Sequence, residues 1–196
     1  ARKDQNSTTI YLREGKYVLD KPLMLTSDDG NDSKELIIKN YPGEKTVLSS
    51  GIVLDLKWEK YKNGIMRAVV KGSPVMDMLF VNGELKSMAR YPNYDEKAVR
   101  FNGTSALATA PERVKKWKCP EGGYLHAMHK HDWGDFHYRI TGKNEKGELQ
   151  LEGGWQNNRP MGIHNENRMV ENIFEELDAP GVWYYDKKEG WLYYYC

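Results

Sequence analysis

Histidine is concentrated in one short stretch of this sequence, HAMHKHDWGDFHY at residues 126–138, which holds four of the chain's five histidines. Trp133 lies in the same stretch between two aspartates. Imidazoles can hold a metal ion, transfer protons near neutral pH, or hydrogen-bond to hydroxyl groups. The zinc-protease helix needs histidines four residues apart with a glutamate after the first, and here Ala127 follows His126. The stretch therefore lacks that motif.

Read as an extended strand, the stretch places His129 and His131 on one face and His126 on the other. A zinc site would need a third protein ligand, which His137 could supply across a turn at Trp133 and Gly134. Two other interpretations remain open: a partly solvated polar strand face, or a sugar-contact face that hydrogen-bonds and stacks without ionising. We predict no bound metal and no cofactor, because period-two alternation brings only two imidazoles together.

A long polar loop, GGWQNNRPMGIHNEN at residues 153–167, is the second candidate for ligand contact. Loops often carry ligand contacts, and the planar side chains of Trp155 and Arg159 suit sugars. The alternative is purely structural, since Asn and Gly are ordinary turn residues. The candidate sugar-contact residues are therefore His129, His131, Trp133, His137, Trp155 and Arg159.

Acidic residues cluster in MVENIFEELDAPG at residues 169–181 and could suggest the paired acids of glycoside hydrolysis. The apolar residues of this segment lie at helical spacing and predict a short helix that stops at Pro-Gly; they are Val170, Ile173, Phe174 and Leu177. Most of its acids would then fall on a solvated face. We assign no catalytic residue in this chain. Arg90, in ARYPN, is interpreted as structural, anchoring backbone carbonyls where a strand exits.

The elements that would position these residues are short strands. Those in the first fifty residues are mostly aliphatic and are separated by Gly, Pro or Asp turns, at residues 8–12, 16–20, 23–26, 35–39 and 46–49. This pattern predicts an all-β fold. It fits stacked parallel coils of a β-solenoid, with a β-sandwich as the alternative. The expected inward side chains are Ile10, Leu12, Val18, Leu23, Leu25, Leu36, Ile38 and Val47.

After Gly51 the pattern becomes antiparallel. Turns at Lys62-Asn63-Gly64 and at Asn82-Gly83 predict hairpins, and the second is the strongest short hairpin signal. PERVKKWKCP at residues 111–120 is consistent with one helical turn. Further strands are expected in YLHAMHK, FHYRITG, GELQLEG, VWYYD and WLYYY, with turns at KNEKG and KKEG.

Composition excludes several classes of protein. The net charge is +1 with no basic run, so nucleic acid and anionic membranes are not expected partners. No stretch approaches the roughly 18 apolar residues of a membrane span. The chain has 13 Tyr and 6 Trp against 4 Phe, which suits half-buried strands and sugar stacking. Its ends, ARKDQNS and WLYYYC, lack a signal peptide and a polar tail, so we expect a piece of a longer protein.

Several segments also carry a resemblance. TTIYLREGKYVLDKPLMLTS and LIIKNYPGEKTVLSSG resemble the opening coils of right-handed parallel β-helix carbohydrate enzymes. LFVNGELKSMARYPN, ELQLEGGWQNNRP and VENIFEELDAPGVWYYDKKEGWLYYY together resemble the N-terminal region of glycoside hydrolase family 141, where a β-rich domain interrupts the first coils. The similarity runs over essentially the whole chain. Val182 departs from it, because such proteins often carry Glu there.

The resemblance implies the start of a right-handed parallel β-helix over residues 1–53. It implies an inserted antiparallel β-domain, sandwich- or barrel-like with one short helix, over residues 54–196, which returns to the β-helix at its C-terminal end. The catalytic carboxylates of such enzymes lie on later coils, so none can be assigned here.

The implied function is that of a non-catalytic N-terminal segment of a secreted, periplasmic or cell-surface glycoside hydrolase, similar to α-L-fucosidases and xylanases that act on complex polysaccharide. The segment would cap the β-helix and border the substrate cleft, and its partners would be carbohydrate and the remaining β-helix. Two alternatives remain open: the same segment of a β-helix polysaccharide lyase, or a stand-alone carbohydrate-binding or structural module.

Overall fold

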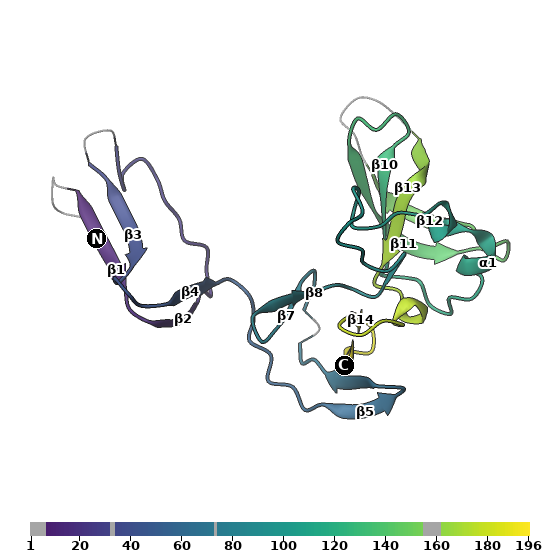
Figure 1. Cartoon of the computed structure of the whole chain (residues 1–196), viewed down its shortest axis with the longest axis horizontal. Coiled ribbons are helices and arrows are strands. Elements are labelled where there is room, and N and C mark those ends of the chain that lie inside the picture. The colour runs from purple at the N-terminus through teal and green to yellow at the C-terminus, as the bar shows by residue number, and fades with distance from the viewer. Residues whose placement is uncertain (1–6, 32–33, 73, 155–161) are drawn as a thin grey trace. The chain divides into compact units, whose positions relative to one another are not determined.

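The computed structural model describes residues 7–31, 34–72, 74–154 and 162–196. The chain divides into two compact units, Ala1–Asp55 and Leu56–Cys196, which we call the N-terminal unit and the C-terminal unit. Each is described by itself. The strands of both are visible in Figure 1.

The N-terminal unit is built from parallel strand pairs. Strand β1 (Thr8–Leu12) pairs with β3 (Leu36–Asn40), and β2 (Gly15–Val18) pairs with β4 (Thr46–Ser49). The chain thus makes a first turn, β1 then β2, and lays a second turn, β3 then β4, beside it in the same direction (Figure 1). The prediction of stacked parallel strands is confirmed at these two pairs.

The corner between the two strands of each turn is also stacked. The Arg13 guanidinium donates to the Glu44 carboxylate at 2.9 Å, and the same carboxylate accepts the Glu14 backbone N–H at 2.6 Å. Arg13 also lies over the Tyr41 ring, 4.8 Å from its centroid. The arginine and these hydrogen bonds lower the pKa of Glu44. These contacts hold the corners of the two turns together.

Two expectations for this unit are wrong. Residues 23–26 form no strand, and Leu23 and Leu25 are 56% and 60% exposed. None of the buried apolar residues of the described chain lies before Ile65. Of the eight side chains expected inside, Ile10, Val18 and Val47 are also exposed, while Leu12, Leu36 and Ile38 are half-buried. The physical reason is that a solenoid turn buries its aliphatic side chains only between neighbours, and two turns leave most of them uncovered.

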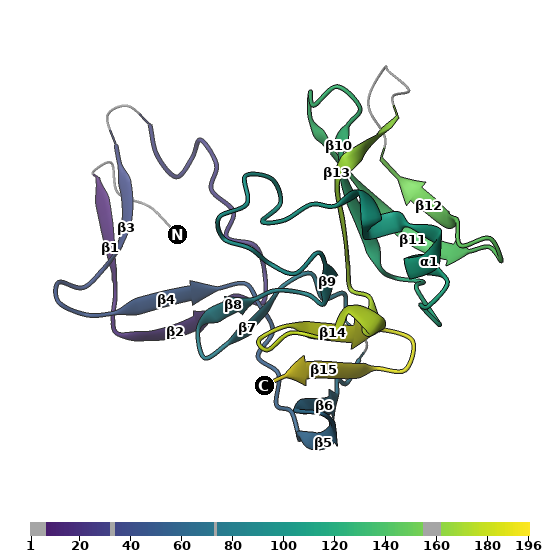
Figure 2. The ribbon, with the colours of Figure 1, turned by 45° about the vertical axis from the view of Figure 1, so that its right-hand side comes forward.

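The C-terminal unit is antiparallel in all its strand pairs among the described residues. Its four-stranded sheet has the order β14-β15-β6-β5 (Figure 2). These strands are β5 (Glu59–Lys62), β6 (Ile65–Val69), β14 (Trp183–Asp186) and β15 (Trp191–Tyr195). A separate hairpin joins β7 (Leu79–Val81) to β8 (Glu84–Lys86).

The five-stranded sheet has the order β12-β11-β10-β13-β9. Its strands are β9 (Arg90–Tyr91), β10 (Tyr124–His129), β11 (Asp135–Lys143), β12 (Leu149–Gly153) and β13 (Ile163–Glu171). Neither large sheet closes on itself, so the barrel-like alternative is not observed. The 3-10 turn η1 (Ala106–Thr109) and the short helix α1 (Pro111–Val114) follow β9. The helical turn expected in PERVKKWKCP is therefore confirmed.

The prediction of a helix over residues 169–181 is wrong. β13 continues through Glu171, Asn172 has a left-handed φ of 52°, and only the 3-10 turn η2 (Phe174–Glu176) follows. Pairing of this segment with β10 and β9 overrides its helical spacing. Val170 and Ile173 still reach the core with Trp117 and Leu125.

The acids of this segment do not form a solvated face either. Glu176 is buried, where its carboxylate accepts the Trp117 indole N–H at 2.8 Å and pairs with the Arg113 guanidinium at 2.8 Å. A buried carboxylate needs such donors, because burial without them is costly. The described residues contain no helix long and apolar enough to cross a membrane.

Candidate functional site

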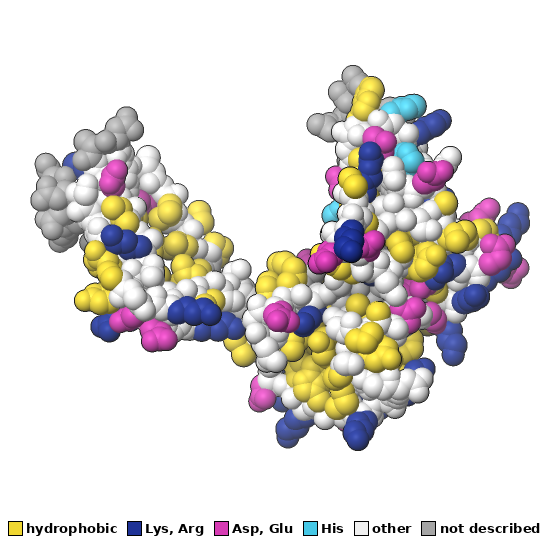
Figure 3. Space-filling model, in the orientation of Figure 1, with side chains coloured by type: hydrophobic (Ala, Val, Ile, Leu, Met, Phe, Trp, Pro, Cys, Tyr) yellow, Lys and Arg dark blue, Asp and Glu magenta, His cyan; other side chains and the backbone are white. Residues whose placement is uncertain are grey.

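The hairpin formed by β10 and β11 brings two imidazoles into contact. In its antiparallel register His126 lies opposite His137, and the ring centroids are 3.8 Å apart. Directly opposed residues on one face of a sheet are its closest side-chain neighbours. In the space-filling view, histidine side chains reach the surface near β10 and β13 (Figure 3).

A glutamate from the neighbouring strand completes this group. Glu171 of β13 places Oε1 2.8 Å from His126 Nε2. Tyr124 lies opposite both Glu171 and Arg139 in the sheet. The resulting polar surface, which we call the imidazole face, consists of Tyr124, His126, His137, Arg139 and Glu171.

Burial and charge set the protonation of this face. Burial lowers the pKa of His137, and the nearby His126 lowers it further, against smaller opposing effects of Asp135 and Glu171. Burial raises the pKa of Tyr124, and the negative charge of Asp77 adds to that rise. At neutral pH the face therefore offers a neutral imidazole and a protonated phenol beside the Glu171 carboxylate.

The loop after β9 borders the imidazole face. Arg90 is buried and donates to three backbone carbonyls, those of Pro92 at 2.9 Å, Phe101 at 2.7 Å and Gly103 at 2.8 Å. The loop so held places the Phe101 ring edge-on to His126, with 6.3 Å between centroids. The structural role predicted for Arg90 is confirmed by these bonds.

A second contact ties the same loop to the turn between β10 and β11. Arg100 Nη1 donates to Asp132 Oδ1 at 2.5 Å, and Asn167 Nδ2 donates to the same oxygen at 3.3 Å. Desolvation works to raise the pKa of Asp132, but these two hydrogen bonds lower it overall. Asp132 adopts a left-handed φ of 59°, as a tight turn requires.

The turn itself presents an exposed tryptophan. Trp133 is 67% exposed and lies nearly parallel to the His129 ring, at 18° and 5.7 Å between centroids. His129 is fully buried, and its Nδ1 accepts the His131 backbone N–H at 3.0 Å. We call the exposed pair His131 and Trp133 the turn platform, with His129 as its base.

The structure separates histidines that the sequence analysis placed together. His137 lies opposite His126 and not beside His129, whereas His131 lies outside the strand, in the turn. The turn expected at Trp133 and Gly134 is centred earlier, because Met128 pairs with Asp135. Trp155 and Arg159 lie outside the described residues. No group of three or more metal-ligating side chains gathers anywhere in the described ranges.

Four members of the imidazole face were missed from the sequence: Tyr124, His126 as a contact residue, Arg139 and Glu171. The signal that could have found them is the hairpin register, since two strands joined by a turn centred near residues 131 and 132 place His126 against His137. Glu171 could not be found this way, because it reaches the site on β13, about 40 residues along the chain.

Comparison with known proteins gives one informative match. No protein-family model and no curated protein matches the sequence. A solved structure named "Glycoside hydrolase" matches 95% of this chain with a TM-score of 0.66 and 26% sequence identity. This chain spans 35% of that chain. The chain is thus related in structure to a glycoside hydrolase, which is consistent with a carbohydrate-active role.

Proposed function

We propose that this chain is a non-catalytic segment of a β-helix glycoside hydrolase that acts on complex polysaccharide, as the family 141 resemblance implies. The observation that carries the proposal is the match to a glycoside hydrolase over 95% of the chain. Because the chain spans 35% of that chain, the reaction itself is assigned to the remainder of the enzyme. An exported location, whether secreted, periplasmic or cell-surface, belongs to the same proposal.

The parallel turns of the N-terminal unit support a β-helix. Thr8 pairs with Leu36 and Gly15 pairs with Thr46, so the two turns repeat after 36 − 8 = 28 and 46 − 15 = 31 residues. Parallel strands that follow each other at such a repeat are the basis of a solenoid. The proposed β-helix extends this pattern with further turns.

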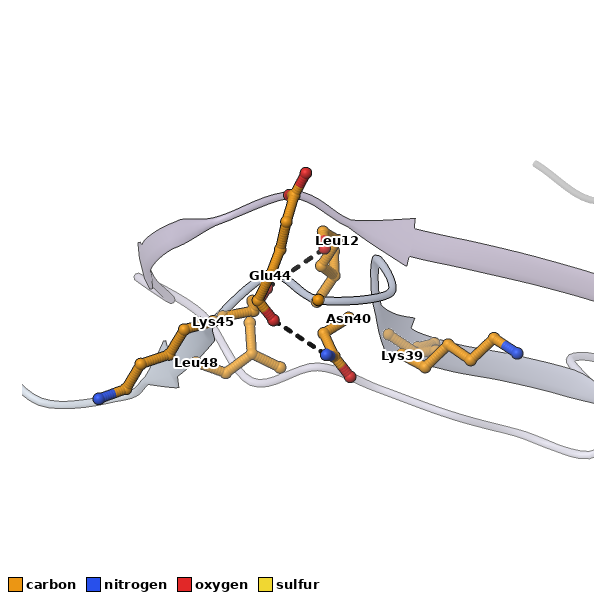
Figure 4. A pocket seen from close by; sticks show the side chains of 9 residues that line it. Leu12, Lys39, Asn40, Glu44, Lys45 and Leu48 are labelled. Carbon is orange, nitrogen blue, oxygen red and sulfur yellow. Dashed lines mark hydrogen bonds between the residues drawn. The ribbon is translucent and has the colours of Figure 1, made fainter.

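The uncovered side chains of the N-terminal unit support the proposal of a further turn. A hollow of about 710 Å³ is lined by side chains of both turns, among them Leu12, Ile38 and Leu48 (Figure 4). On its rim Asn40 Nδ2 donates to the Glu44 carbonyl at 2.9 Å. A third parallel turn with aliphatic side chains would bury these residues, which supports the remaining β-helix as a partner.

Two surfaces of the C-terminal unit are proposed to contact carbohydrate. The turn platform offers the Trp133 indole as a stacking plane and the His131 imidazole beside it, with 6.3 Å between ring centroids. His137 on the imidazole face is the second contact. His129 is buried and is proposed to support Trp133 instead of touching sugar. Trp155 and Arg159 remain candidate contacts.

The test is saccharide binding by this chain and its Trp133→Ala variant, measured by affinity electrophoresis in plant polysaccharides. We expect binding to weaken roughly three- to tenfold, because an aromatic stacking contact is worth about 0.5–1.5 kcal/mol. The melting temperature should change little, since Trp133 is exposed. Trp58→Ala, at another partly exposed tryptophan, is the matched control and should bind like the wild type.

A second measurement tests the non-catalytic part of the proposal. Reducing ends and unsaturated uronates released from the same polysaccharides should stay at the blank rate. Activity that disappears when an acid such as Glu171 is replaced would contradict it. Wild-type binding by the Trp133 variant would contradict the proposed contact surface.

A further inference from the structure

The two imidazoles of the imidazole face differ in their partners and in their exposure to solvent. Glu171 Oε1 lies 2.8 Å from His126 Nε2, with only 20% and 15% of the two side chains exposed. An ionised carboxylate only accepts hydrogen bonds, so Nε2 of His126 must carry the hydrogen of this contact. The carboxylate therefore fixes both the orientation and the donor nitrogen of His126.

His137 is the accessible member of the pair. Its side chain is 63% exposed, and Nε2 lies 3.8 Å from the Asp135 carboxylate, too far for a hydrogen bond. Desolvation and the neighbouring His126 lower its pKa. At neutral pH His137 is thus a neutral imidazole with one N–H donor and one nitrogen acceptor. A sugar hydroxyl, which donates and accepts, matches that pair of groups.

The charges around the pair favour an uncharged ligand. Carboxylates flank it on two strands, Asp135 on β11 and Glu171 on β13. The two nearby arginines are already engaged, Arg139 with Glu152 and Arg90 with backbone carbonyls. Tyr124 on β10 adds a neutral phenol. A uronate or sulfate would meet two carboxylates with no unengaged arginine among the described neighbours.

We propose that the His126–His137 pair binds hydroxyl groups of a neutral saccharide, with His137 in direct contact and with His126 and Glu171 as positioning residues. This inference rests on the proposed function. It adds the class of sugar that binds and the protonation state of His137 that binding requires. Protonation of His137 removes its acceptor nitrogen and places a positive charge beside the His126 ring. Binding is therefore present above the pKa of His137 in the folded protein and is lost as the pH falls through it.

The experiment compares neutral and acidic oligosaccharides released from plant cell walls and separated by anion exchange, using the full chain. Calorimetry at pH 7.5 should show binding of the neutral fraction, weakened roughly three- to tenfold in His137→Ala, as loss of a hydrogen bond predicts. The wild type should lose binding as the pH falls through the titration midpoint of the His137 ring, and the variant's residual binding should not depend on pH over that range. Better binding of the acidic fraction would overturn the proposal.

An NMR measurement tests whether His126 acts as a positioning residue or has a merely structural role. NMR titration of the His137 ring should show a midpoint that rises in His126→Gln, because the lowering effect of His126 on the pKa of His137 is gone. The loss of binding should move to higher pH with it. An unchanged midpoint would overturn the assignment of His126. The amide spectrum of the same sample checks that the variant is folded.

The outcomes also distinguish this inference from the proposed function. Weakened binding in Trp133→Ala together with wild-type binding in His137→Ala would remove the imidazole site and keep the carbohydrate role. If neither fraction binds the wild-type chain, the carbohydrate contacts and this site both fail.

Discussion

Arg90 shows how one side chain can shape the border of a site without belonging to it. Arg90 as a whole is 5% exposed. Its guanidinium donates hydrogen bonds to the backbone carbonyls of Pro92, Phe101 and Gly103. Burial lowers its pKa, against an opposing effect of Glu171. The planar fork of arginine suits three carbonyls at fixed directions, which lysine cannot match. The loop that carries Phe101 to His126 depends on this residue.

Replacing Arg90 with Ala should lower the free energy of unfolding by about 3 kcal/mol, because buried carbonyls lose charged donors. Denaturant unfolding followed by tryptophan fluorescence measures the loss. Arg139→Ala is the control, since its pair with Glu152 is exposed and should contribute less than about 1 kcal/mol. Equal effects of the two substitutions would contradict the anchoring role.

His137 should make stability depend on pH. Its pKa in the folded state is lowered, so below about pH 6.5 the unfolded chain takes up a proton that the folded chain resists. The free energy of unfolding should therefore fall as the pH drops from about 6.5 to the folded-state pKa, and be unaffected by this group above that window. His137→Gln should flatten this part of the profile in urea titrations, whereas His131→Gln should keep it.

At the scale of elements, two Asn-Gly turns do most to fix local structure in the C-terminal unit. Asn63 and Gly64 have φ of 49° and 80°, and Asn82 and Gly83 have φ of 54° and 85°. Two successive positive φ values are the mark of the type I′ turn, whose twist matches that of a hairpin. β5–β6 and β7–β8 therefore follow directly from these dipeptides.

The two glycines should differ in how they tolerate alanine. At Gly83 a Cβ meets nothing within 4 Å, so Gly83→Ala should cost only the left-handed backbone, about 1–2 kcal/mol. At Gly64 a Cβ would lie 2.9 Å from the Tyr195 ring, so Gly64→Ala should cost more, about 2–3 kcal/mol. Thermal unfolding of both variants tests the order, and the reverse order would refute the packing of Tyr195 on this turn.

At the scale of the whole molecule, the two units differ in what they bury. Every buried apolar residue of the described chain lies between Ile65 and Tyr193. The C-terminal unit has two clusters, one around Trp117 and Leu125 and one around Leu177 and Tyr184. The N-terminal unit instead exposes aliphatic side chains over its strands (Figure 3). Stability therefore resides in the C-terminal unit.

Residues 56–196 expressed alone should unfold in one cooperative transition, while residues 1–55 alone should show none. The reason is that a folded unit must offset its conformational entropy by burial, and the two parallel turns bury no apolar side chain fully. Circular dichroism melts and amide dispersion of the two segments measure this. A cooperative melt of residues 1–55 would show that the two turns need no further neighbour.

The sequence by itself determined the elements whose cause is local. Asn-Gly turns, alternating strands and the short PERV turn were predicted from neighbouring residues, and so was the anchoring role of Arg90. The aliphatic pattern of the first strands left a β-sandwich as an alternative, and it was the resemblance that implied the parallel pairing seen in the structure. The turns and the short helix depend on backbone preferences and side-chain types that act over a few residues.

Only the tertiary structure decided which side chains meet. Despite the helical spacing of residues 169–181, the first part of this segment forms a strand that pairs with β10 and β9. That pairing places Glu171 beside His126. The register of one hairpin moved His137 from His129 to His126, because a shift in register changes every cross-strand neighbour. Contacts between strands far apart in sequence are set by the burial that the whole sheet achieves, and no short stretch of sequence contains that information.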